Sequence, residues 1–206
     1  IVVCLFSGLF LFSALAIHYQ WLIRADFYWF DQSVSELAAQ QAPDDEIVII
    51  TIDDYSLDTM KNLAGRWVWP RSVHAELIEG LMPFQPNVIA FDILFAEKDI
   101  YRPDADAYLN EVLNRHDNVY FSMLVLASDS DKGYVLEQLR QWLPMLTTDS
   151  FSDKSRSQLL LPLAITRDNW RLGTINYRAE LDGVGRYYDV YQHGTGWKMA
   201  SLASVL

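Results

Sequence analysis

EIVIITIDD (residues 46–54) is a short apolar run rich in Ile and Val, which is typical of a strand buried on both faces, as in a parallel sheet. VIAFDILF (88–95) has the same character. Between them, RWVWPRSVHAELIEGLMPF (66–84) has the apolar spacing of a helix. We therefore predict a strand–helix–strand unit in which Ile47–Ile52 and Val88–Leu94 are adjacent parallel strands.

The rest of the chain continues this alternation of helices and strands. Pro70 suits the first turn of the central helix, and Leu77, Ile78 and Leu81 supply its buried face. Further elements are expected in this order: a helix over 104–114, a strand over 119–127, a short helix over 135–143, a hairpin turn at 182–183 and a helix over 201–206. The predicted fold class is α/β, with a mixed, partly parallel sheet flanked by helices and preceded by a transmembrane helix.

Residues 1–23 contain no Asp, Glu, Lys or Arg, and their apolar run has the length of about 20 residues that spans a bilayer as a helix. Tyr19 and Trp21 stand where an interfacial aromatic belt would lie, and Arg24 can reach the headgroups. A signal peptide and a buried core helix are the alternatives, but the apolar run is long and continues into aromatic residues, and it has no polar face. We predict a transmembrane helix over 1–23 and a folded domain over 26–206.

The composition restricts the classes of partner. The chain of 206 residues has a formal net charge of −11, which repels nucleic acid, so no nucleic-acid partner is expected. Cys4 is the single cysteine, so the chain holds neither an internal disulfide nor a multi-cysteine metal site. No phosphate-binding glycine loop, dinucleotide fingerprint or common hydrolase motif is present.

One group of charged residues is a candidate ligand-binding site. The carboxyl ends of parallel strands lie at a shared edge of the sheet, and open α/β sheets bind ligands at that edge. We call this group the acidic rim, and its candidate ligand-binding residues are Asp53, Asp54, Arg71, His74, Asp92, Glu97 and Asp99. Arg71 could pair with Asp53 or Asp92 as a structural latch, or the group could form a pocket for a ligand or cation, or, least expected, a catalytic site. No catalytic residue, cofactor or metal-binding residue is assigned.

Several strings in this order and spacing resemble one known family. They are IVIITIDDYSL (47–57), WVWPRSVHAELIEGL (67–81), VIAFDILFAEKD (88–99), GTIN (173–176), DGVGR (182–186) and SLA (201–203). Together they resemble the CHASE domain of type two, a sensory domain of bacterial receptors that lies outside the cytoplasmic membrane. The resemblance covers residues 26–206, except for the polar stretch over 128–156, which does not align.

The resemblance implies a signal-sensing input domain with no enzymatic activity of its own. It places the domain in the periplasm or outside the cell, anchored to the bacterial inner membrane. It also implies further membrane helices and a cytoplasmic histidine kinase, protein kinase, adenylate or diguanylate cyclase, or phosphodiesterase. The expected partners are a small-molecule or ionic signal, the membrane through the N-terminal helix, and a second copy in a homodimer. The alternative is a membrane-tethered, metal-dependent hydrolase that uses the acidic rim.

Overall fold

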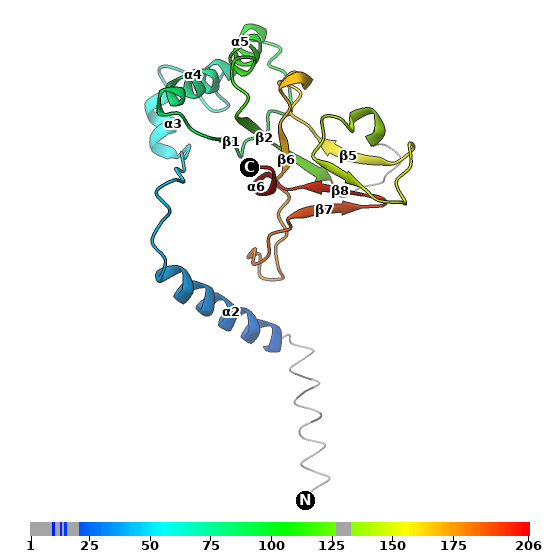
Figure 1. Ribbon diagram of the computed structural model, residues 1–206. Helices are drawn as coiled ribbons and strands as arrows, with labels where there is room; N and C mark the ends of the chain where they lie inside the picture. The colour runs from blue at the N-terminus through cyan, green and yellow to red at the C-terminus, as the bar shows by residue number, and fades with distance from the viewer. Residues whose placement is uncertain (1–9, 11–12, 14, 16–20, 127–132) are drawn as a thin grey trace, which may run out of the picture. The chain divides into compact units, whose positions relative to one another are not determined.

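The computed structural model describes residues 10, 13, 15, 21–126 and 133–206 of the chain (Figure 1). The chain divides into two compact units, Ile1–Ile52 and Asp53–Leu206. Each unit is described by itself, and every candidate site residue belongs to the second one.

The first unit contains α2 (Trp21–Ala39), which ends four residues before Pro43. None of its residues is buried. Most of residues 1–23 fall outside the described part of the chain, so the membrane span over 1–23 stays a prediction. Among the described residues, no helix has both the length and the apolar character that crossing a membrane requires.

The predicted strand Ile47–Ile52 is absent from the structure. The segment has no regular secondary structure, and most of its apolar side chains are exposed, Val48 at 79% and Ile49 at 81%. The prediction that it forms one of two adjacent parallel strands is therefore wrong. A run of β-branched residues becomes a buried strand only where other elements cover both of its faces, and the sequence pattern cannot show whether they do.

The main sheet of the second unit is mixed, as expected, and β2 is its central strand. Two strands run parallel to β2, and their register places Ile89 opposite Val119 and Phe121 opposite Leu172. The strand order is β1–β2–β5–β3, and β6 also pairs with β2. The strands are β1 (Ile89–Phe91), β2 (Val119–Leu126), β3 (Tyr134–Val135), β5 (Arg156–Leu160) and β6 (Leu172–Thr174).

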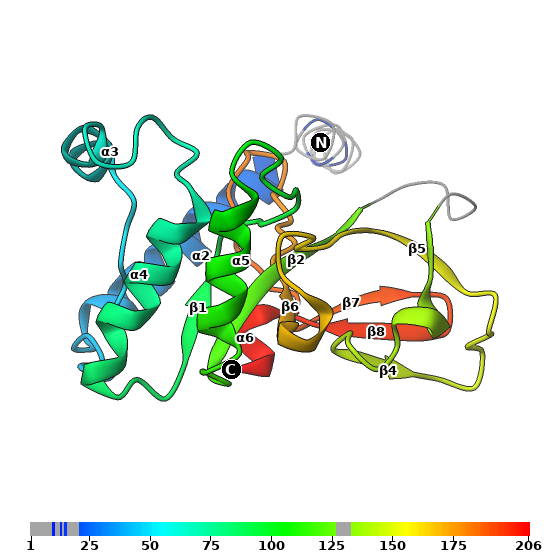
Figure 2. The ribbon, with the colours of Figure 1, turned by 90° about the horizontal axis from the view of Figure 1, so that it is seen from above.

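Two helices pack against each other beside this sheet, and Figures 1 and 2 show them lying side by side. They are α4 (Arg71–Leu81) and α5 (Pro103–Leu113). Because α5 connects the parallel strands β1 and β2, the unit β1–α5–β2 is the strand–helix–strand crossover of this fold. The crossover therefore lies one strand later in the chain than the sequence predicts.

The smaller elements complete the second unit. A separate antiparallel sheet has the order β4–β8–β7. The turn at Gly183 has no strand on either side, so the predicted hairpin there is wrong; the hairpin is β7–β8, with Gly196 at a φ of 81°. The remaining elements are α3 (Asp54–Met60), η1 (Met82–Phe84), η3 (Leu136–Leu139), β4 (Met145–Thr147), η4 (Arg167–Asn169), β7 (Tyr191–Gly194), β8 (Trp197–Ala200) and α6 (Leu202–Val205).

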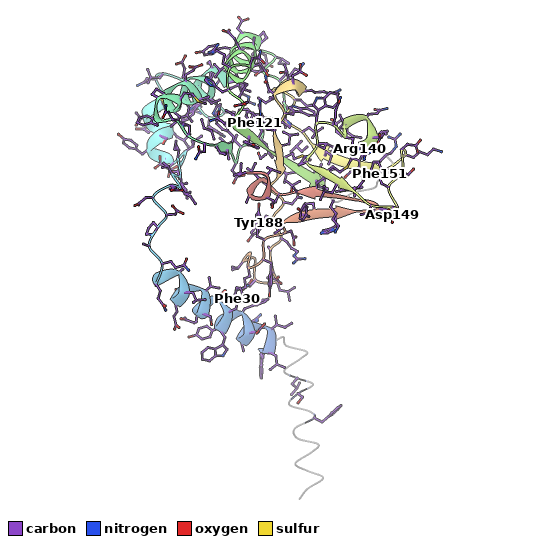
Figure 3. All side chains as sticks on the ribbon, viewed as in Figure 1. Phe30, Phe121, Arg140, Asp149, Phe151 and Tyr188 are labelled. Carbon is purple, nitrogen blue, oxygen red and sulfur yellow. The ribbon has the colours of Figure 1, made fainter. Side chains whose placement is uncertain are left out.

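The hydrophobic core lies where α4 and α5 meet the parallel strands. Ile78 of α4, Leu109 of α5 and Phe121 of β2 are fully buried in it, and Figure 3 labels Phe121 at this place. Phe95, in the loop after β1, is also fully buried. This aromatic end of the core fixes the position of the first turn of α4, where the site residues gather.

Candidate functional site

The first turn of α4 begins at Arg71 directly after Pro70, whose backbone φ of −53° suits a helix start. His74, Ala75 and Ile78 are the buried residues of this helix, and their spacing of one, three and four residues defines its inner face. That face directs His74 into the core. Arg71 lies one turn earlier on the same side, so local helix geometry brings these two predicted site residues together.

Aromatic rings surround His74. Its ring centroid lies 5.2 Å from that of Phe95, 5.9 Å from that of Phe91 and 6.3 Å from that of Trp67, and each of these contacts is edge to face. Trp67 in turn contacts Trp69 at 5.4 Å. With 2% of its surface exposed, His74 is a core residue among aromatic side chains.

This environment keeps the His74 imidazole neutral. The pKa of His74 is lowered from 6.5 to about 4, mainly by burial and in addition by the positive charge of Arg71. The ring is therefore uncharged across the physiological pH range. It can donate one hydrogen bond and accept one, but it cannot act as a pH switch near neutrality.

Arg71 is half-buried and stacks on Phe95, with its Cζ atom 4.9 Å from the ring centroid. Burial lowers the pKa of its guanidinium group, and the negative charges of Asp106 and Asp99 partly offset that effect. Within the described part of the chain, Arg71 forms no ion pair with a carboxylate. The predicted latch to Asp53 or Asp92 is not formed.

Asp99 and Asp106 are held by well-defined hydrogen bonds. The Asp99 carboxylate accepts from Arg102 Nε at 2.8 Å and from the backbone N–H groups of Arg102 and Tyr101 at 3.0 and 3.1 Å. Desolvation raises the pKa of Asp99, but these bonds together outweigh it and leave the pKa below its ordinary value. The Asp99 backbone N–H donates to Asp106 Oδ2 at 2.8 Å, which joins the loop after β1 to the first turn of α5.

Four buried polar atoms in this region have no hydrogen-bond partner among the described residues. They are Trp69 Nε1, Arg71 Nε, His74 Nε2 and Asp106 Oδ1. A buried polar atom that lacks a partner costs about 1–3 kcal/mol, so native proteins contain few of them. Four in one neighbourhood are groups that ordered water or a bound molecule can satisfy. We refer to Trp69, Arg71, His74, Asp99 and Asp106 as the α4 cluster.

The structure brings together only part of the acidic rim. Arg71, His74 and Asp99 lie in the α4 cluster, whereas Asp92 and Glu97 are exposed on the loop after β1. Asp53 is the N-cap of α3, where its Oδ1 accepts from the backbone N–H and the hydroxyl of Ser56 at 2.8 and 2.7 Å. Asp54 is the exposed first residue of the same helix. No contact joins these four outlying carboxylates to Arg71 in the described structure, so their role as ligand-binding residues stays a prediction.

Asp106 and Trp69 are the residues of the cluster that the sequence analysis did not select. Asp106 precedes the buried residues Leu109 and Leu113 of α5 by three and seven positions, so helical spacing places it on the buried face. This helical periodicity is the feature of the sequence that identifies Asp106 as a candidate, because a lone carboxylate on an apolar helix face needs a partner. Trp69 gives no comparable signal, since its burial depends on how the loop before α4 folds.

Two other features lie apart from this cluster. A shallow cavity of about 340 Å³ is lined by Leu126, Gly133, Tyr134, Gln158 and Leu159, between β2, β3 and β5, and none of the predicted site residues borders it. No group of three or more His, Cys, Asp or Glu side chains in the described ranges is arranged to hold a metal ion. The described residues therefore contain no set of metal ligands that supports the alternative function, a metal-dependent hydrolase.

Comparison with known proteins adds the family. A model of the CHASE2 domain matches residues 2–206. No curated protein and no solved structure matches the chain significantly. Since the family model covers nearly the whole chain, the chain belongs to the CHASE2 domain family, whose members are extracytoplasmic sensory domains.

Proposed function

We propose that this chain is the signal-input domain of a membrane-anchored bacterial receptor. Membership of the CHASE2 family is the observation that carries the proposal. The charge-free run over residues 1–23 has the length of a membrane anchor, and it would hold the domain at the outer face of the inner membrane. The receptor's cytoplasmic output module would be a kinase, a nucleotide cyclase or a phosphodiesterase.

In this proposal the α4 cluster receives the signal, a small molecule or ion, and the domain itself catalyses no reaction. Supporting observations are its four unpartnered buried polar atoms and its location between the loop after β1 and the starts of α4 and α5. A ligand held there would contact three segments that belong to different parts of the chain. Its binding could therefore shift their relative positions, and a homodimer would transmit that shift across the membrane.

A reporter fusion tests the orientation. Alkaline phosphatase joined after Leu206, on the protein with its natural N-terminus, should be active, because that enzyme folds only outside the cytoplasm. A β-galactosidase fusion at the same position is the matched control and should be inactive. The reverse pair of results would contradict the proposal.

The output module is tested in the natural full-length protein. The sequence that follows Leu206 should contain further membrane helices and then a kinase, cyclase or phosphodiesterase domain. Substitution of Arg71 by Met should change the activity of that output domain without changing the amount of receptor in the membrane. A receptor with unchanged output in every α4-cluster variant would contradict sensing at this place.

A further inference from the structure

The α4 cluster contains one cation and one carboxylate that are not paired with each other. Asp99 and Arg102 form an ion pair at 2.8 Å, so their charges cancel locally. Arg71 and Asp106 remain, and they interact through space without forming an ion pair. The cluster thus presents both a positive and a negative group to any molecule that enters it.

The unpartnered atoms have a definite hydrogen-bonding character. Trp69 Nε1 and Arg71 Nε can only donate, whereas Asp106 Oδ1 in the ionised carboxylate can only accept. Trp69 is 6% exposed and His74 is 2% exposed, so bulk water cannot readily satisfy these two side chains. A matching molecule must accept hydrogen bonds at one end and donate them at the other.

These side chains are neighbours. Arg71 and His74 both contact the ring of Phe95, at 4.9 and 5.2 Å from its centroid. Trp67 contacts both His74 and Trp69, which connects the ring of Trp69 to the same group. Arg71 is also the first residue of the eleven-residue helix α4, whose N-terminal end carries a partial positive charge that favours a carboxylate.

We propose that the α4 cluster binds a zwitterionic amino acid. Its carboxylate accepts hydrogen bonds from Arg71 and Trp69, and its ammonium group donates to Asp106. A simple anion would leave Asp106 Oδ1 without a donor, and a simple cation would leave Arg71 and Trp69 without an acceptor. Neutral His74 supplies a further hydrogen-bonding group without adding charge. The inference rests on the proposed sensory function and specifies the class of signal.

Thermal unfolding of the whole purified chain in detergent, with the common L-amino acids added one at a time, tests the proposal. At least one amino acid should raise the melting temperature, and isothermal titration should show saturable binding of the same compound. Acetate and methylammonium, which carry the two charges separately, should raise the melting temperature much less at equal concentration.

Two substitutions separate the two ends of the ligand. Arg71→Met removes the cation, and Asp106→Asn removes the negative charge at similar size; each should weaken binding about tenfold or more, as expected for loss of a charge-assisted hydrogen bond. Arg140→Met is the matched control, because Arg140 also stacks on a phenylalanine, Phe151, at 5.7 Å. Figure 3 labels this pair in a different part of the domain from Phe121, and the control should bind normally.

Three results would overturn the proposal. The first is that no amino acid shifts the melting temperature or binds in the titration. The second is that acetate or methylammonium alone stabilises the chain as strongly as the amino acid does. The third is binding that survives in folded Arg71→Met and Asp106→Asn proteins. None of these results affects the reporter fusions, so failure here is distinguishable from failure of the proposed sensory function.

Discussion

The imidazole of His74 and the ring of Phe95 meet edge to face, with centroids 5.2 Å apart and planes inclined by 83°. Phe91 and Phe121 stack beside them at 5.6 Å, and Phe95 contacts both. Such packing stabilises the rings beyond the burial of their area. It also leaves His74 among apolar neighbours and one cation, which sets its protonation state.

Stability should depend on pH through His74. Its pKa is about 4 in the folded state and 6.5 as the ordinary value, so between these pH values the unfolded chain binds a proton that the folded domain does not. Stability is therefore complete above pH 6.5 and decreases as the pH falls towards 4. The expected loss between pH 7 and pH 5 is about 2 kcal/mol, measured by urea unfolding.

His74→Phe keeps an aromatic ring and removes the titrating group, so it serves as the matched variant. The difference in unfolding free energy between the wild type and this variant should shift by about 2 kcal/mol over the same interval, because all other titrating groups cancel. If this difference in unfolding free energy did not change with pH, the pKa of His74 would be the same in the folded and the unfolded state.

Arg71 should influence the titration of His74. Its positive charge is the second cause of the lowered pKa, after burial, so Arg71→Met should raise the pKa of His74 above about 4 while leaving it below 6.5. Arg71→Lys keeps the charge and should leave the pKa nearly unchanged. NMR titration of the imidazole protons measures both, and an unchanged pKa in Arg71→Met would show that the two groups do not interact.

Removal of the Phe95 ring should be costly, because this fully buried side chain contacts Phe91, Phe121 and Arg71. We expect Phe95→Ala to lower the unfolding free energy by about 3–5 kcal/mol. Phe84→Ala is the control, since Phe84 is 82% exposed and its loss should change stability by less than about 0.5 kcal/mol. Chemical denaturation compares the two, and equal effects would contradict this description of the core.

Two glycines should respond in opposite directions to alanine. A Cβ atom at Gly173 of β6 would overlap the backbone of Leu202, so Gly173→Ala should destabilise by about 1–3 kcal/mol or more. Gly80 of α4 has no neighbouring atom within 4 Å of a new Cβ outside its own helix, and Gly80→Ala should stabilise by about 0.5–1 kcal/mol. A tolerated Gly173→Ala would show that β6 and α6 do not approach closely.

Asp53 should act as a helix cap. Hydrogen bonds from the side chain and the backbone of Ser56 lower the pKa of Asp53, so its carboxylate is ionised at neutral pH and the cap is lost as the pH falls through that lowered value. Asp53→Ala should speed exchange of the Ser56 amide proton, whereas Asp53→Asn should preserve most of its protection. Hydrogen exchange by NMR measures this. Equal protection in wild type and Asp53→Ala would assign Asp53 another role.

The sequence alone predicts those features that depend on local patterns. Apolar spacing and Pro70 predict α4, because helix starts and buried faces depend on residues within one or two turns. The run over 119–127 predicts β2, and the ordered strings predict the family. Arg71 and His74 are neighbours for the same reason, since they lie three residues apart on one helix.

Only the tertiary structure decides the features that depend on distant parts of the chain. Ile47–Ile52 has the composition of a buried strand but is mostly exposed, because burial requires covering elements that its own sequence does not contain. Arg71 lacks the predicted carboxylate partner because Asp53 caps α3 and Asp92 is exposed. Asp106 is held in the α4 cluster by a hydrogen bond that its side chain accepts from the backbone N–H of Asp99, seven residues earlier. Such contacts depend on how the loop after β1 folds against α5, and no local periodicity encodes that geometry.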